Sequence, residues 1–198
     1  MRKLCLFALI LLFPIFAYSQ PGSPIDLRTG ARITETFEHY EVHEGDHYTF
    51  TIDSTVGDTD TLGIIIITPD TKEWAHVVFD AQGALDTHLK IFETNTEVPG
   101  NTRTAYNNDR NSTNTNTTLI KHWRRKSGAD GTLIYRNHFG IDSGLGANKK
   151  IGGGGDRASQ EWILKQNTQY LVALVSATAG NIVSLKISWY ETTFIDQR

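Results

Sequence analysis

The sequence predicts an all-β protein, an antiparallel β-sandwich or jelly roll, and three observations support this fold class. The chain contains about ten short runs of alternating or β-branched residues. Turn-forming residues separate several of these runs at intervals of about 8–12 residues, a spacing that is typical of sandwiches. No segment shows a convincing apolar period of 3.6 residues, as an amphipathic helix would. The length of 198 residues and the hydrophobic fraction of 39% suit one domain with a sizeable core.

Residues 1–19 are predicted to be a cleaved signal peptide. A basic start precedes the apolar run from Leu4 to Phe16, and small residues at Ala17 and Ser19 occupy the positions that a signal peptidase reads. Cleavage before Gln20 would make the mature protein secreted or periplasmic. An uncleaved anchor is the alternative, but the apolar run is short for a membrane span. After cleavage no membrane contact is expected.

Loss of the leader would also leave the mature chain without cysteine, because the single cysteine is Cys5. Disulfides, a thiol nucleophile and cysteine-based metal sites are then excluded. The formal net charge is −3, and about −5 once Arg2 and Lys3 are removed. This balance gives no reason to expect nucleic acid or an anionic membrane as a partner.

The expected elements follow the leader in order. Residues 20–32 are rich in Pro, Gly and Ser and predict an extended arm, residues 33–193 the β-sandwich domain, and residues 194–198 a polar tail. Strands are expected where apolar residues alternate or β-branched residues run together: 37–42, 47–52, 62–67, 75–79, 85–92, 119–123 and 132–135. Polar loops are expected over 53–60, 95–118 and 140–155.

Residues 161–191 contain the clearest predicted feature, a β-hairpin. Its first arm, Tyr170 to Ser176, is apolar almost throughout, as expected for a strand covered on both faces. The sequence Ala179-Gly180-Asn181 predicts the turn. In the second arm polar residues alternate with an apolar row that should face a core: Val183, Leu185, Ile187 and Trp189.

Two groups of potential metal ligands carry weak signals. Three histidines recur every four residues: His39, His43 and His47. A glycine at position 45 favours a turn over a helix there, so surface histidines are a better interpretation than a zinc site. Three aspartates gather in a predicted loop: Asp53, Asp58 and Asp60. They lack the spacing and the closing glutamate of a calcium loop. No metal and no cofactor is therefore expected.

The motifs that suggest catalysis or phosphate binding are also incomplete. Asp142-Ser143-Gly144 lacks the flanking glycines of a nucleophile elbow. The glycines at 152–155 lack the Lys-Ser/Thr and the helix that complete a phosphate loop. The basic run over 121–126 is short and stands in an acidic protein, which favours a solvated strand end over a polyanion site. Because no acid/base pair stands out, the protein is not expected to be an enzyme.

A secreted carbohydrate- or cell-surface-binding module is the alternative function class. Four aromatic side chains could stack on a sugar ring: Trp74, Tyr106, Trp123 and Tyr135. Three polar residues beside Tyr106 could supply hydrogen bonds to a glycan: Asn107, Asn108 and Asp109. Asn111 and Asn116 begin glycosylation sequons, which matter only in a host that glycosylates asparagine.

Five segments of the chain resemble an uncharacterised family of tailed-phage virion proteins, associated with head decoration or head fibres. They are turn and strand-edge sequences, and together they span about residues 37–191: HYEVHEGDHY (39–48), ITPDTKEWAH (67–76), AYNNDRNS (105–112), IGGGGDRASQEWILKQNTQYLV (151–172) and SWYE (188–191). The family has no established site, so the resemblance implies no functional residue.

The resemblance implies a non-enzymatic structural protein that acts as a decoration or fibre-type component of a virion surface. Such a protein would self-associate, for example as a trimer, and contact other virion or cell-surface proteins. Self-association would also cover exposed edge strands.

Overall fold

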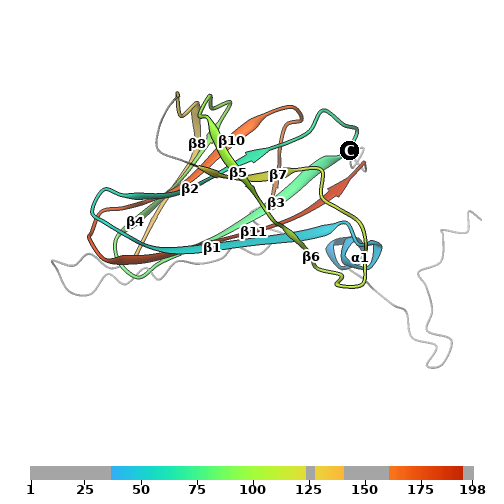
Figure 1. Cartoon of the computed structure of the whole chain (residues 1–198), viewed down its shortest axis with the longest axis horizontal. Helices are drawn as coiled ribbons and strands as arrows, with labels where there is room; N and C mark the ends of the chain where they lie inside the picture. The colour runs from blue at the N-terminus through green and yellow to red at the C-terminus, as the bar shows by residue number, and fades with distance from the viewer. Residues whose placement is uncertain (1–36, 124–127, 141–160, 194–198) are drawn as a thin grey trace, which may run out of the picture. The chain divides into compact units, whose positions relative to one another are not determined.

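The computed structural model describes residues 37–123, 128–140 and 161–193 (Figure 1). This part of the chain forms two antiparallel sheets packed face to face and one short helix, which confirms the predicted all-β sandwich. None of its helices combines the length and the apolar character needed to cross a membrane. Several predictions lie outside the described residues: the leader 1–19, the arm 20–32, most of the basic run, the segment 142–144, the glycines 152–155 and the tail 194–198.

One helix and a series of strands follow one another along the described chain. They are α1 (Phe37–Glu44), β1 (His47–Val56), β2 (Thr61–Ile67), β3 (Trp74–Gly83), β4 (Thr87–Glu93), β5 (Pro99–Arg103), β6 (Tyr106–Asn107), β7 (Leu119–Trp123), β8 (Thr132–Phe139), β9 (Trp162–Ile163), β10 (Gln169–Ser176) and β11 (Asn181–Thr192).

The described strands form a five-stranded sheet in the order β6-β1-β11-β3-β9 and a six-stranded sheet in the order β5-β7-β2-β10-β4-β8. In Figure 1, β1, β3 and β11 run together in one layer, and β2, β4 and β10 belong to the other. β5 and β6 follow each other in the chain but lie in different sheets. The chain therefore crosses between the layers between Arg103 and Tyr106.

The core lies between the sheets and is centred on the inner row of β11. As the alternation predicted, four side chains of this row are completely buried: Val183, Leu185, Ile187 and Trp189. The β-branched run of β2 lies between β7 and β10, in the interior of the six-stranded sheet. Its Ile64 and Ile66 join the same core cluster, together with Val172 and Leu174 of β10. Burying each such side chain contributes roughly 1.5–3 kcal/mol.

The predicted hairpin of β10 with β11 is wrong. β10 pairs with β2 and β4, whereas β11 pairs with β1 and β3 in the other sheet. The outward side chains of β10, Leu171 and Ala173, are buried in a second apolar cluster on the far face of the six-stranded sheet. The outward row of β11 includes the exposed Lys186. If β10 and β11 were paired, Leu171 and Ala173 would lie beside the solvent-exposed row of β11. The Ala179–Asn181 segment instead connects the two sheets.

The strand predicted over 37–42 is also wrong, because these residues belong to α1. Gly45 has a φ of 79° and ends the helix. The Gly45 N–H donates to the Val42 carbonyl (3.1 Å) and the Asp46 N–H to the Glu41 carbonyl (2.9 Å), the two bonds of a Schellman cap. The glycine that favoured a turn over a helix is thus the C-terminal cap of that helix.

The Asn/Thr-rich segment 95–118, predicted to be one long loop, carries β5 and β6 and is fixed to the core by Glu191. One carboxylate oxygen of Glu191 accepts hydrogen bonds from the backbone and hydroxyl of Thr117 (2.7 and 2.6 Å). The other oxygen accepts from the Thr118 N–H (2.8 Å) and the Trp189 indole (3.0 Å). Strands also extend past their predicted ends, since β1 continues to Val56 and β8 to Phe139.

We predict that replacement of Glu41 in α1 changes how stability depends on pH. Burial, with a smaller effect of Asp46 and Glu44, raises the pKa of Glu41 from 4.5 to about 7. The folded state therefore holds this proton more tightly than the unfolded chain, and the resulting stabilisation is lost as the pH rises from about 4.5 to about 7. Glu41→Gln should increase the free energy of unfolding at pH 8 by on the order of 1–3 kcal/mol and leave it nearly unchanged at pH 4.

Urea unfolding of the variant at both pH values checks this prediction. Asp58→Asn, at an exposed position, is the control and should change neither value by more than about 0.5 kcal/mol. An equal gain for Glu41→Gln at pH 4 and pH 8 would contradict the proposed origin of the effect.

Candidate functional site

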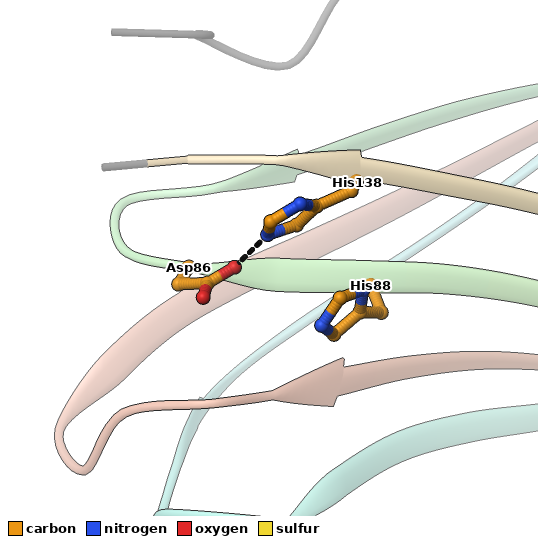
Figure 2. A group of neighbouring side chains, drawn as sticks. All are labelled: Asp86, His88 and His138. Carbon is orange, nitrogen blue, oxygen red and sulfur yellow. Dashed lines mark hydrogen bonds and ion pairs between the residues drawn. The ribbon is translucent and has the colours of Figure 1, made fainter. Parts of the chain in front are cut away.

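Asp86, His88 and His138 form the one group of potential metal ligands found among the described residues. Each offers one ligand atom, and the three atoms all lie within 4.8 Å of one another. Figure 2 shows Asp86 in the turn that leads into β4, His88 on β4 and His138 on the neighbouring β8. The site therefore lies at one end of the β4–β8 pair.

The strand geometry brings these side chains together. His88 lies between Thr87 and Leu89, which are buried in the sandwich, so its own side chain projects from the outer face of the sheet. The antiparallel register places His138 directly opposite His88. Cβ atoms of such partners are about 4.5–5.5 Å apart, and the two imidazole rings stack with their centroids 4.3 Å apart and their planes 19° from parallel.

The two histidines differ in their electrostatic environment. Nε2 of His138 is paired with the carboxylate of Asp86, and the His138 side chain is 58% exposed. Burial, together with the nearby His138, lowers the pKa of His88, and Arg136 and Lys90 act in the same direction while Asp86 opposes them. His88 is therefore a neutral imidazole at neutral pH. Its Nδ1 is buried and has no hydrogen-bond partner.

Asn181 holds the backbone of the site in place. Its fully buried side chain donates to the Thr87 hydroxyl (2.8 Å), the Ser176 hydroxyl (3.0 Å) and the Asp86 carbonyl (3.3 Å), and it accepts from the Leu85 N–H (2.8 Å). The connection between β10 and β11 is thereby joined to the turn before β4. All hydrogen-bonding groups of this buried amide have partners, which makes the turn rigid.

Gly140 fixes the other side of the site, two residues after His138. It has a φ of 99°, and a side chain there would overlap the backbone of Leu85 and Asp86. A glycine is required by both its conformation and this close approach. The end of β8 is thus held against the turn that carries Asp86.

The aromatic residues predicted to bind a sugar do not gather on one face. Trp74 begins β3, and Tyr106 lies on β6, 59% exposed, with the Arg110 guanidinium 5.4 Å from its ring centre. Trp123 packs over Gly63 on the outer face of the six-stranded sheet. Tyr135 packs against the core, with its ring edge-on to that of Trp162 (5.6 Å, 74°).

The three polar residues beside Tyr106 make structural contacts. The Asn107 amide donates to the Gly45 carbonyl (2.5 Å). The Asn108 amide nitrogen lies 2.6 Å from Nδ1 of His47. Asp109 accepts from the backbone of Asn111 (2.9 Å). These side chains hold the Asn/Thr-rich segment against α1 and the start of β1.

His39, His43 and His47 do not converge. Because they lie one turn apart on α1, His39 and His43 contact each other, with their Nε2 atoms 2.8 Å apart. His47 begins β1, is buried, and lies 3.2 Å from the carboxylate of Glu38. The predicted absence of a helix here was therefore wrong, but the three imidazoles still do not share one site. Asp53, Asp58 and Asp60 form no described metal group either.

Sequence reasoning missed the group of Asp86, His88 and His138. It predicted a strand over 85–92, where the structure has β4. It ended the later strand at Tyr135, three residues before His138, so it did not pair the histidines. The Asp-x-His spacing of Asp86 and His88, which places both on one side of an extended chain, was the available signal.

Comparison with family models, with curated proteins and with solved structures gives no match to this chain. The resemblance to tailed-phage virion proteins stays a prediction.

We predict that Asn181→Ala destabilises the protein by about 2–4 kcal/mol, because several buried polar groups each lose a hydrogen bond at once. Chemical denaturation measures the change, and amide exchange should show the largest loss of protection at Leu85. Asn111→Ala, at an exposed position, should cost less than about 0.5 kcal/mol. A small effect of Asn181→Ala would show that the turn before β4 does not depend on this amide.

Proposed function

We propose that the protein is a non-enzymatic structural module that associates with further copies of itself through β8, which is an edge strand of the six-stranded sheet in the described part of the chain. It would act in this way as a decoration or fibre-type component of a virion-like surface. The observation that carries the proposal is the length and openness of this edge.

The four edge strands of the described sheets differ in length. β6 and β9 have two residues each and β5 has five, whereas β8 has eight. In the described part of the chain, no strand pairs with the outer side of β8. The unpaired backbone groups of such an edge are a template for another strand.

The side chains of β8 offer little protection against pairing. The strand contains no proline and only one residue of fixed charge, Arg136, and Leu133 is 47% exposed. A register shift opposite Ile91 and Phe92 is its main irregularity. Charges, prolines and bulges are the usual devices that keep edges apart. With one charge, one register shift and no proline over eight residues, β8 remains suited to accept a second strand.

A second copy of this chain is the occupant that we favour. Pairing of β8 with β8 would be symmetric and give a dimer, whereas pairing of β8 with β5 of the next copy would give a ring such as a trimer where the rotation between copies closes. In both cases the longest free edge becomes buried. The virion-like setting follows from the resemblance, and export follows from the predicted leader.

We predict that the purified protein is a closed oligomer and that Leu133→Lys weakens its association at least about tenfold, a change of 1.4 kcal/mol. A lysine on an edge strand is one of the devices that oppose pairing with a further strand. Light scattering on a sizing column, over a range of concentrations, measures the molar mass of both proteins.

Ile182→Lys is the matched control. Ile182 is 60% exposed on β11, an interior strand of the other sheet, so the same substitution there should leave the molar mass unchanged. A monomeric wild type at all concentrations would overturn the proposal. It would favour the secreted carbohydrate- or surface-binding module, which glycan binding by Tyr106 variants would then test.

A further inference from the structure

We propose that Asp86, His88 and His138 form a binding site for a divalent transition-metal ion, with Zn²⁺ as the ion that fits the ligand set. This site goes beyond the proposed structural function and does not depend on self-association. It lies on the outer face of the β4–β8 pair, where the histidines stack across the two strands.

The ligand chemistry selects the class of ion. Two imidazole nitrogens and one carboxylate oxygen are the donors that zinc and its neighbours in the transition series prefer. Calcium and magnesium favour sites made of oxygen ligands alone. Three protein ligands also leave at least one coordination position open to water or to another ligand.

The geometry needs only small side-chain adjustments. Tetrahedral zinc with bonds of about 2.0–2.1 Å places its ligand atoms about 3.3 Å from one another. The three candidate atoms already lie within 4.8 Å of one another. An ion between His138 and Asp86 requires their direct contact to open, and the exposed His138 side chain is the one that would rotate away, because Asn181 holds the turn at Asp86.

One of the two histidines has a polar atom without a hydrogen-bond partner, which a bound ion could supply. His138 is paired with Asp86, and an ion between them would contact both groups. His88 stacks on His138, yet its Nδ1 is buried and has no hydrogen-bond partner. A buried polar atom without a partner is costly. Coordination of an ion by this Nδ1 would give the atom the polar partner that the described residues do not supply.

An anion site is the competing interpretation. Lys90 and Arg136 form the next cross-strand pair on the same face, and their positive charges would attract a phosphate and repel a cation. The carboxylate of Asp86 favours the cation instead. The effect of Lys90 on binding therefore distinguishes the two interpretations.

The first experiment titrates Zn²⁺ into the full chain by calorimetry, in competition with a chelator of known affinity. One ion should bind per chain. His138→Ala and Asp86→Asn should each weaken binding by more than the 10–100-fold that loss of an outer partner costs. Circular dichroism confirms that both variants fold, which is expected because His138 is exposed and Asp86→Asn keeps the shape of the side chain.

His43→Ala is the matched control, because His39 and His43 are a second pair of contacting imidazoles in the described structure. This variant should leave zinc affinity unchanged. Loss of binding in His43→Ala together with full binding in His138→Ala would overturn the proposal. So would the absence of zinc binding to the wild type.

Lys90→Gln separates the cation from the anion. It should strengthen zinc binding, because it removes a nearby positive charge, and the His88 and His138 ring resonances should shift when zinc is added. The opposite result has two parts: inorganic phosphate binds at this face with an affinity that Lys90→Gln lowers, and zinc leaves the resonances of both rings unshifted. That result would show that the proposed metal site is wrong. None of these outcomes depends on the oligomeric state, so they are separable from the test of edge pairing.

Discussion

The complete burial of the inner row of β11 is the constraint on which the rest of the structure depends. Val183, Leu185 and Ile187 lie against the opposite sheet and expose no surface. Trp189 continues the row, and its indole N–H needs a buried acceptor, which Glu191 supplies. The same carboxylate also binds Thr117 and Thr118. Through Glu191, the buried Trp189 thus helps to determine where the Asn/Thr-rich segment lies, although that segment has few apolar residues of its own.

The separation of β10 from β11 follows from the same constraint and positions the candidate site. β10 is apolar on both faces and therefore occupies the interior of its sheet, where its outward side chains pack with Phe92 and Trp123. The chain must then cross between the sheets after Ser176. Asn181 is buried in this crossing, and its amide binds the residues around Asp86. The fold requires hydrogen bonds for the buried Asn181 amide. The same hydrogen bonds position the turn that carries the Asp86 carboxylate beside His138.

Much of the fold could be predicted from the sequence, because a period of two residues states which face of a strand is buried. This held for the inner row of β11. The same period does not state which strand is the neighbour, so β10 was paired with the wrong partner. Local signals were ambiguous at Gly45, since a positive φ serves a turn and a helix cap equally well. The candidate site depends on the register between β4 and β8, which is a long-range property.

The two proposed roles of β8 are compatible because a strand uses different directions for its backbone and its side chains. Its free N–H and C=O groups point along the sheet, where a further strand would pair. The side chain of His138 leaves the sheet through the outer face, towards His88 and Asp86. A strand added at the edge would extend the sheet without displacing either histidine. Metal binding could then persist in an assembled form, and the ion would bridge β4 and β8 at the edge that carries the contact.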